Sequence, residues 1–534
     1  MEYDYALNNA SVLDGTGNPA YHASIAISGG KISRISPRPL HGKVTISCDG
    51  LTVCPGFIDI HSHSDVVPLA EQTVKRKMTS EKVMQGVTTE VNGNCSFSAA
   101  PLSDAHVDLL KDFMEPLGHF KYDIAWTTYA EYLTAIERAG LATNFVGLVG
   151  HGTLRIAVMG MQGRKADADE KKKMSSLLDD ALNDGAFGLS TGLLYTPGSY
   201  ADPSELIELC KVVAARYGIV TSHLRDYGDN LERSINEALN WSRSTGVRLQ
   251  ISHCMVVGQA NWGTASKAVA LIEKARAEQL DVAFDQYPYT AGMTDLRAAL
   301  PPWMADGGPE DFRKRLQDPE ARNRAGRDMT AGLESWESIS RNIGWDNVVI
   351  GFCEGRKDLE GKSVSHSARE SGKSSEDFVF DLLLTEPTTP LIVIHMMNEN
   401  DVRLIMRHPL QMFGTDGIPT TGKTHPRTLG SYPRILSKFV KEESVLTVQD
   451  AVRRMTSFPA SRVGLRDRGI VTEGLAADLV VFDHRRIKDR ATFDEPNQYP
   501  EGIEHVFVNG VPAVRDGSYQ ASYSGRVLKP TMSP

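Results

Sequence analysis

The chain repeats one pattern of apolar and polar positions along most of its length. A short run of β-branched and other apolar residues ends in polar side chains, and a stretch with helical periodicity follows. Two of these helical stretches read SELIELCKVVAARYG and SKAVALIEKARAEQL. Short buried strands that alternate with helices are typical of a parallel βα architecture.

Eight strand-like runs follow this pattern, and eight is the number of strands in a TIM-like barrel. They end at His63, Cys95, His151, Thr191, Arg225, Cys254, Tyr289 and Asp416. A further apolar run, PLIVIHMM, ends near His395 and is either a ninth strand or one that replaces a barrel strand. We therefore expect an α/β fold in which a TIM-like (β/α)8 barrel spans residues 55–466.

The two ends of the chain and one internal segment depart from this pattern. Apolar and polar residues alternate in HASIAISGGKISRIS near the start and in IEHVFVNGVPAVRDG near the end. This period of two predicts that residues 1–54 and 467–534 form one small β-sandwich. Residues 291–343 are rich in proline, glycine and charge and are too many for an ordinary barrel loop, so we expect an inserted lid subdomain there.

Composition and charge narrow the class of protein. The 534 residues are 41% hydrophobic and 23% charged, which predicts a buried core. A net charge of −9 without a long basic run argues against a nucleic-acid partner. The start of the chain lacks the features of a signal peptide, and no run approaches 18 apolar residues, so we expect a cytoplasmic protein without a membrane partner.

The cysteines are not arranged as in a disulfide-stapled secreted domain. Six of them are spread over a long chain without a CxxC pair, which predicts free thiols. Cys95, at the end of the second strand, is then either a small buried hydrophobe or a thiolate ligand. Sulfur and imidazole together suit zinc.

Several potential metal ligands fall at predicted strand ends. They are His61, His63, Cys95, His223, His253 and Asp416. The two histidines of HSH are two residues apart on a strand and so project from one face. A single histidine on a strand is commonly a hydrogen-bonded core residue. Four of them at the carboxyl-end rim of a barrel, where active sites are built, favour a metal site.

An ordered series of motifs gives these positions a family context. The chain resembles the D-aminoacylase (N-acyl-D-amino-acid deacylase) branch of the metal-dependent amidohydrolase superfamily. The matching segments, in chain order, include VLDGTGNP, PGFIDIHSH, GVTTEVNGNC, VGHGTLR, GLSTGLLYTPG, TSHLRDYGD, DQYPYTAG, PPWM, GTDG, HPRTLGSYPR and GLAADLVVFD. They run nearly from one end of the chain to the other.

The resemblance implies a site for one or two zinc ions. By analogy, the principal zinc is held by Cys95, His223 and His253. A second and often weaker position is framed by His61, His63 and Asp416. Many relatives in the superfamily bridge their metals with a carboxylated lysine on the fourth strand. Here that strand reads GAFGLSTG and has no lysine, which fits a bridge through the cysteine.

The expected reaction is hydrolysis of the amide bond of N-acyl-D-amino acids. Zinc lowers the pKa of bound water to about 7, and Asp416 would accept the water proton and pass it to the leaving nitrogen. The resemblance suggests that Tyr195 helps to stabilise the oxyanion; the alternative is an aromatic residue that packs at a loop. His151, Arg225 and His395 would orient ligands or hold loops.

The expected substrate contacts come from the same resemblance. Arg427 is similar to a family arginine that pairs with the substrate α-carboxylate; the alternative is a surface cation. Tyr287 matches a family binding position; the alternative is a phenol in the barrel core. Two positions depart from the family. Met255 replaces a common lysine and Met293 replaces a common serine, which predicts a more apolar pocket and either a bulky hydrophobic substrate or one with a less demanding carboxylate.

Two other functions remain open from the sequence. A cyclic-amide hydrolase of the dihydroorotase or hydantoinase type would share the barrel and the metal chemistry, and the missing lysine keeps it open. A non-catalytic scaffold is the other alternative, because some barrel relatives have lost their metal ligands. All six ligand candidates are present in this chain, which disfavours the scaffold.

Overall fold

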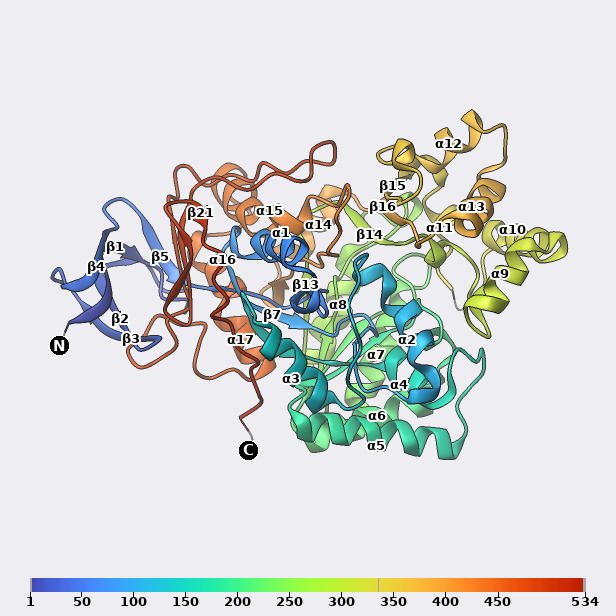
Figure 1. Ribbon diagram of the computed structural model, residues 1–534, viewed down its shortest axis with the longest axis horizontal. Coiled ribbons are helices and arrows are strands. Elements are labelled where there is room, and N and C mark those ends of the chain that lie inside the picture. Colours follow the sequence, from blue (N-terminus) through green and yellow to red (C-terminus); the bar gives the residue numbers. More distant parts are fainter. Residues whose placement is uncertain (1, 335, 532–534) are drawn as a thin grey trace.

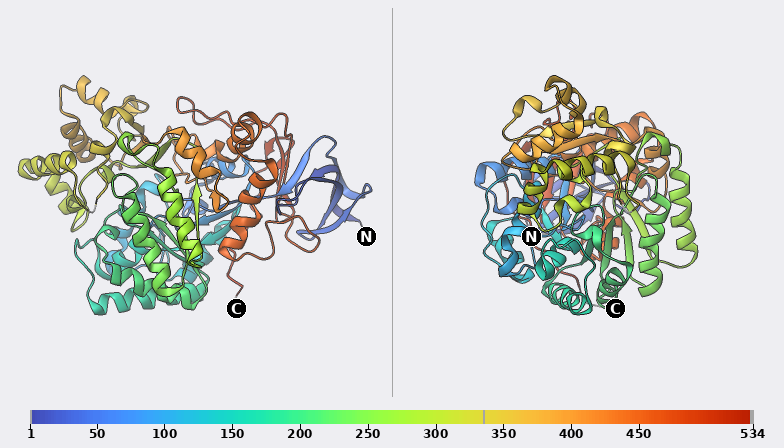
Figure 2. Two further views of the ribbon diagram at one scale, coloured as in Figure 1. Left: turned by 180° about the vertical axis from the view of Figure 1, so that it is seen from behind. Right: turned by 90° about the vertical axis from the view of Figure 1, so that its right-hand side faces the viewer.

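The fold has three parts, arranged along the long axis of the molecule (Figure 1). In the computed structural model, residues 2–334 and 336–531 are described. A barrel occupies the centre, a sheet built from both chain ends lies on one side, and an inserted segment lies on the other. Figure 2 shows the same order from behind, with the inserted segment and the terminal sheet at opposite ends.

The central part is a closed barrel of eight parallel strands. In ring order these are β6 (Phe57–Asp59), β7 (Val87–Asn92), β8 (Asn144–Gly147) continued by β9 (Val149–Gly150), β10 (Gly188–Gly192), β11 (Ile219–His223), β12 (Arg248–Ile251), β13 (Val282–Gln286) and β17 (Gln411–Phe413). The ring closes where the amide of Asp416 donates to the carbonyl oxygen of His61 at 2.8 Å and Ser62 pairs in parallel with Gly417. The predicted TIM-like barrel is confirmed.

Helices follow the strands and cover the outside of the barrel. They include α1 (Gln72–Val83), α5 (Ala168–Asp184), α6 (Pro203–Ala215), α7 (Leu231–Thr245) and α8 (Ala265–Ala277). The two helical stretches singled out in the sequence correspond to α6 and α8. Helix α6 begins at Pro203 behind an Asp202 N-cap that accepts from the amide of Glu205, a combination that favours helix initiation.

The PLIVIHMM run is not a barrel strand. It forms β16 (Leu391–His395), which pairs antiparallel with β14 (Ala291–Asp295) and β15 (Val348–Phe352) in a separate sheet. The inserted layer therefore continues at least to His395, beyond the predicted boundary at residue 343. A short buried apolar run has the same pattern in a parallel and an antiparallel sheet, which is why the sequence left its place open.

The inserted layer begins directly after β13, at the carboxyl end of a barrel strand. Its helices include α9 (Pro309–Gln317), α10 (Pro319–Ala331), α11 (Ile339–Asn342) and α13 (Ser375–Thr385). Because the layer starts at the rim where active sites are built, its residues can reach the barrel mouth.

Both chain ends join in one nine-stranded sheet. Its strands are β1 (Tyr3–Val12), β2 (Tyr21–Ser28), β3 (Lys31–Ser36), β4 (Gly42–Ser47), β5 (Thr52–Pro55), β18 (Leu479–Phe482), β19 (Ile503–Val508), β20 (Val511–Arg515) and β21 (Ser518–Tyr519). The antiparallel pairing of β5 with β18 connects the two ends. This sheet has its own apolar core, to which Leu7, Ile25, Val53 and Leu479 contribute. The expected β-sandwich of the two chain ends is therefore present.

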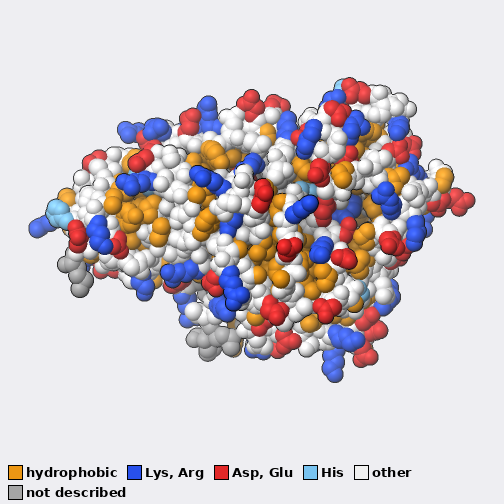
Figure 3. All heavy atoms as spheres, in the orientation of Figure 1, with side chains coloured by type: hydrophobic (Ala, Val, Ile, Leu, Met, Phe, Trp, Pro, Cys, Tyr) orange, Lys and Arg blue, Asp and Glu red, His pale blue; other side chains and the backbone are white. Residues whose placement is uncertain are grey.

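The surface carries charges of both signs. Figure 3 shows acidic and basic side chains interspersed over the face seen in Figure 1. Within residues 2–334 and 336–531, no helix is long and apolar enough to cross a membrane.

Candidate metal centre

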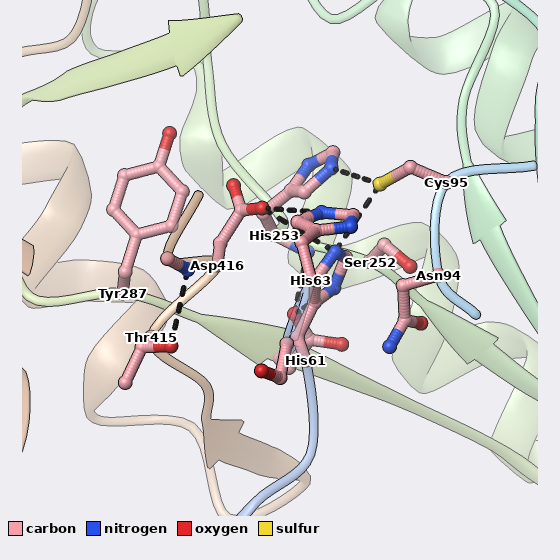
Figure 4. A network of polar contacts seen from close by, with 12 residues as sticks. His61, His63, Asn94, Cys95, Ser252, His253, Tyr287, Thr415 and Asp416 are labelled. Carbon is pink, nitrogen blue, oxygen red and sulfur yellow. Dashed lines mark hydrogen bonds and ion pairs between the residues drawn. The ribbon is translucent and has the colours of Figure 1, made fainter. Parts of the chain in front are cut away.

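The six predicted ligands converge at the carboxyl ends of five barrel strands and their connections. His61 and His63 follow β6, Cys95 follows β7, and Asp416 follows β17. The remaining two are His223, the last residue of β11, and His253, which follows β12. Figure 4 shows five of these side chains, His61, His63, Cys95, His253 and Asp416, pointing toward one another.

Cys95 lies at the centre of this group. Its Sγ atom is 3.2 Å from Nε2 of His61 and 3.5 Å from Nε2 of His253. The ligand atoms of His61, His63, Cys95 and Asp416 all lie within 4.8 Å of one another, and so do those of Cys95, His223 and His253. The side chains therefore outline two adjacent positions for a cation, and the thiol borders both.

Several buried ring nitrogens of this group have no hydrogen-bond partner within the described part of the chain. Both nitrogens of His223 are unpaired, as are Nδ1 of His63 and Nδ1 of His253. Buried polar atoms without partners are costly and rare in native structures. A bound cation would take the lone pair of one nitrogen on each ring, so the donor set fits a metal ion.

The electrostatics of the site keep His63, His223 and His253 neutral, whereas at His61 the nearby Cys95, Asp416 and Asp285 outweigh burial and raise the pKa of the ring. Burial lowers the pKa of His223 to about 3 and that of His63 to about 4. Burial also raises the pKa of the Cys95 thiol. For Asp416, burial would raise the pKa, but Arg427 and His61 outweigh it and hold the pKa well below its usual range. Neutral imidazoles and a carboxylate are the forms that bind a metal.

The backbone turns sharply at three of the ligands. Cys95, His253 and Asp416 have φ values of 52°, 31° and 49°. This left-handed region is unfavourable for residues with a side chain, and such strain gathers at functional sites where the surrounding structure maintains it. The turns direct the three side chains inward at the barrel rim.

Asp285 supports two of the histidines, a role that the sequence analysis did not identify. Its Oδ1 atom accepts from the backbone amide of His253 at 2.7 Å and lies 3.3 Å from Nδ1 of His61. A carboxylate behind a ligating imidazole fixes the orientation of the ring. The signal in the sequence was an acid inside an otherwise apolar strand, VAFDQ.

Lys82 lies beneath the ligands and links the chain segments that carry them. Its Nζ donates to Oδ2 of Asp59 at 2.7 Å, to Oγ of Ser62 at 3.0 Å and to Oγ1 of Thr415 at 2.7 Å. It also lies 3.4 Å from Oε2 of Glu90. The lysine is buried, and it ties the residues beside the histidine pair to the residue before the aspartate. The sequence analysis missed it, because a lysine at the end of a helix is usually solvated.

The five predicted substrate residues line one small pocket next to the cluster. Tyr195, Tyr287, Arg427, Met255 and Met293 border a cavity of about 70 Å³ that also reaches His63, Cys95, His223, His253 and Asp416. The ring of Tyr195 lies 5.0 Å from that of His223, and its hydroxyl is 3.1 Å from Oγ1 of Thr294. Tyr287 donates to Sδ of Met255 at 3.6 Å.

Arg427 is a buried residue of this pocket and not a surface cation. Its Nη1 donates to Oδ2 of Asp416 at 2.7 Å, and its Nη2 donates to the carbonyl oxygen of Met293 at 3.1 Å. The guanidinium lies over the ring of Tyr287 at 4.7 Å. Its Nε atom has no partner among the described residues. The arginine therefore orients the aspartate and retains an unpaired donor at Nε.

The rest of the pocket wall is largely apolar and comes in part from the inserted layer. Ile339, Ile343, Ile394 and Met396 line it together with two acids, Asp295 and Glu337. Burial and the nearby Asp226 raise the pKa of Glu337 to about 8, and its Oε2 accepts from the amide of Tyr227 at 2.7 Å.

Three further residues with expected orienting roles lie outside the cluster. His151 is paired with Glu205 at 2.7 Å. Arg225 is paired with Glu237 at 3.0 Å, and His395 packs its ring 4.8 Å from Phe493. These contacts hold loops and helices together.

Comparisons with known proteins agree with this geometry. The amidohydrolase family profile matches residues 44–514. The chain is 34% identical to D-aminoacylase from Alcaligenes xylosoxydans xylosoxydans, over 99% of this chain and 98% of that protein. It is 35% identical to N-acyl-D-glutamate deacylase from the same organism, over 98% and 96% of the two chains. The chain is also similar in structure to N-acyl-D-glutamate deacylase from Bordetella bronchiseptica, with a TM-score of 0.82 at 30% identity. The match covers 99% of this chain and 100% of that one. That crystal structure is complexed with zinc and a phosphonate mimic of the tetrahedral intermediate.

Proposed function

Because the chain belongs to the amidohydrolase family, we propose that it hydrolyses the amide bond of N-acyl-D-amino acids to a carboxylate and a free D-amino acid. The observation that carries this proposal is the convergence of six ligand side chains beside a pocket with an arginine and two tyrosines. Full-length similarity to two deacylases of N-acyl-D-amino acids supports the substrate class.

Zinc is the proposed cofactor, as one or two ions. The principal position is held by Cys95, His223 and His253. The second position is framed by His61, His63 and Asp416, with the thiolate shared between the two. When bound, zinc lowers the pKa of a coordinated water and polarises a carbonyl group. The mixed sulfur, nitrogen and oxygen donors suit this metal.

Asp416 is the proposed general base and acid. Its low pKa keeps it ionised at neutral pH, so it can accept a proton from the attacking water. Arg427 holds Oδ2, which leaves Oδ1 on the side of His63, 3.0 Å from its Nε2. The same carboxyl group then delivers the proton to the amide nitrogen, which leaves as an amine.

Two pocket residues are proposed to orient the substrate. The Tyr195 hydroxyl, next to His223, would donate to the carbonyl oxygen as negative charge develops on it. The unpaired Nε of Arg427 would meet the α-carboxylate while the terminal nitrogens keep their contacts with Asp416 and Met293. Tyr287 packs beneath the guanidinium and maintains its plane.

The pocket favours a neutral, hydrophobic side chain on the D-amino acid. Met255 and Met293 present thioethers where a cation or a hydroxyl would bind an acidic side chain. Glu337, whose raised pKa keeps it mostly protonated at neutral pH, adds no positive charge to this wall. D-Leucine, D-methionine and D-phenylalanine derivatives should therefore be better substrates than those of D-aspartate and D-glutamate.

The alternatives have less support. A cyclic-amide hydrolase would use the same metal chemistry, but the relatives that match the full chain at 34–35% identity are deacylases of linear amides. A non-catalytic scaffold does not require the six ligand side chains to meet, and they do meet.

The test is a hydrolysis panel with the zinc-loaded full chain. Paired N-acetyl D- and L-amino acids with varied side chains are compared with hydantoins and dihydroorotate. Release of free amine from the D-series, with the hydrophobic members preferred, is the expected result. Ring opening without release of amine from any N-acyl amino acid would refute the proposal.

A further inference from the structure

A second, larger cavity lies directly beside the pocket at the metal cluster. It has a volume of about 430 Å³, against about 70 Å³ for the inner pocket. The two share one wall, formed by Phe97, Leu194, Tyr195 and Asp295. The proposed reaction at the inner pocket does not by itself use this outer cavity.

Much of the lining of the outer cavity is apolar. Phe113, Met161, Leu300, Met304 and Leu316 line it, and all five are buried. Apolar surface that faces an open cavity gains free energy when an apolar group covers it. An aliphatic chain would cover this apolar lining without leaving polar groups of its own unpaired against it.

The polar groups of the outer cavity are mostly engaged with one another. Arg297 is paired with Asp112 at 2.9 Å and with Asp295 at 3.3 Å. Glu115 accepts from the backbone amide of Thr389 at 3.1 Å. The remaining charged residues are Glu310 and Arg313, which are exposed and of opposite sign, and Glu386, which accepts from the amide of Gly355 at 2.7 Å. The cavity therefore offers no buried cluster of one charge that would select an ionic ligand.

The position of the shared wall indicates which part of the substrate faces the outer cavity. Tyr195 belongs to both cavities and is the residue proposed to meet the amide carbonyl oxygen. Arg427, the proposed partner of the α-carboxylate, borders only the inner pocket. The amino-acid half of the substrate is thus directed inward, and the group attached to the carbonyl carbon is directed toward the wall.

We propose that the preferred substrates carry an extended aliphatic acyl chain, which passes the Tyr195 wall and occupies the outer cavity. This inference rests on the proposed deacylase function and specifies its substrate class as N-acyl-D-amino acids with medium-length or long fatty acyl groups. The reaction is the same hydrolysis: water adds to the acyl carbon, the C–N bond breaks, and a fatty acid and a D-amino acid leave.

The experiment measures kcat/KM for N-acyl-D-leucines with acetyl, butanoyl, hexanoyl, octanoyl and decanoyl groups, using the zinc-loaded full chain. Transfer of one methylene from water to an apolar site supplies up to roughly a fourfold gain. We expect kcat/KM to rise with chain length until the cavity is filled.

Variants that fill the cavity test where the chain lies. Ala298 and Ala305 are half-buried residues of the cavity wall, so Ala298→Trp would occupy part of its volume. This variant should lower the decanoyl-to-acetyl ratio of kcat/KM at least tenfold. The matched control is Ala214→Trp, at a half-buried alanine of α6 that does not line the cavity, and it should keep the wild-type ratio. Ala305→Phe replaces Ala298→Trp if that variant does not fold.

The outcomes separate this inference from the function on which it rests. Hydrolysis of the acetyl substrate with a flat or falling dependence on chain length overturns the inference and leaves the deacylase proposal standing. Failure to hydrolyse any member of the series overturns both. Ala298→Trp could instead lower kcat/KM for substrates with a long D-amino-acid side chain and leave the dependence on acyl length unchanged. In that case the cavity holds the amino-acid half of the substrate, and the inference is wrong.

Discussion

Arg427 holds one carboxylate oxygen of Asp416 and leaves the other facing the histidines. Its Nη1 is 2.7 Å from Oδ2, while Oδ1 lies 3.0 Å from Nε2 of His63 and 3.5 Å from Nε2 of His61. The two oxygens of the carboxylate therefore have different roles. Oδ2 fixes its orientation, and Oδ1 can take part in metal binding and proton transfer.

Asp416→Asn should remove the proton acceptor with little change in shape. General acid–base groups contribute about 10²–10⁴-fold to rate, so we expect kcat to fall by at least about 100-fold. Steady-state kinetics together with the zinc content of the same sample provide the measurement. A variant that keeps its zinc and retains a tenth or more of the wild-type kcat would contradict the role of Asp416.

Cys95→Ala should weaken metal binding. Mutation of a residue that hydrogen-bonds to a metal ligand lowers metal affinity or activity about 10–100-fold, and loss of a direct ligand should lower them at least as much. We expect both bound zinc and kcat to fall. The control is Cys210→Ala, which removes another buried thiol, on α6, away from the site. Elemental analysis of the two variants after dialysis is the measurement, and equal zinc contents would count against Cys95 as a ligand.

Met255→Lys should move the substrate preference toward acidic side chains. A lysine at this pocket position would offer a charge-assisted hydrogen bond, worth about 1.5–3 kcal/mol, to a substrate carboxylate. We expect the ratio of kcat/KM for N-acetyl-D-glutamate to that for N-acetyl-D-leucine to rise about tenfold or more. Met255→Leu, which keeps the pocket apolar, should leave the ratio low. If the two variants gave the same ratio, this position would be excluded as a determinant of the preference for charged or neutral substrate side chains.

Glu337 should make stability depend on pH in a defined direction. Its pKa is raised from 4.5 to about 8, chiefly by burial. Between these values the unfolded chain loses the proton and the native protein retains it, so the free energy of unfolding decreases as pH rises from about 4.5 to 8. The contribution is about 2–5 kcal/mol.

The variant Glu337→Gln keeps an acceptor for the Tyr227 amide and removes the titration. Its Tm should exceed that of the wild type by a margin that grows from pH 5 to pH 8, measured by calorimetry. Glu334→Gln, at an exposed glutamate nearby, serves as the control. A margin that is constant across this pH range would contradict the prediction.

Lys82→Met should destabilise the fold and loosen the metal site together. The substitution leaves Asp59 and Glu90 buried without their cation, which costs about 3–5 kcal/mol. The control is Lys77→Met on the same helix, whose side chain is 38% exposed and pairs with Glu81. That change should cost less than about 1 kcal/mol. Chemical denaturation and zinc retention are measured for both variants, and comparable values would show that Lys82 has no special role.

Much of the fold and of the candidate site was predictable from local pattern. The HSH motif places His61 and His63 on one face of a strand, and the apolar runs that precede His223 and His253 mark two further strand ends. Parallel barrel strands bring their carboxyl ends to one rim, so residues far apart in the sequence were expected to meet there. Their convergence on Cys95 agrees with that expectation.

Other features depend on contacts that no local pattern encodes. The strand ending at His395 is apolar like a barrel strand, and its antiparallel partners in the inserted layer assign it elsewhere. Lys82 and Asp285 appeared as an ordinary helix cation and a strand acid, and their roles depend on neighbours such as Asp59 and His253, which are more than twenty residues away from them in the sequence. Periodicity and motif spacing follow from the geometry of a single element, and they were sufficient for the barrel and the ligand set. The Arg427–Asp416 pair, the Glu337 environment and the outer cavity arise where separate elements pack, because burial and electrostatic partners are properties of the assembled fold.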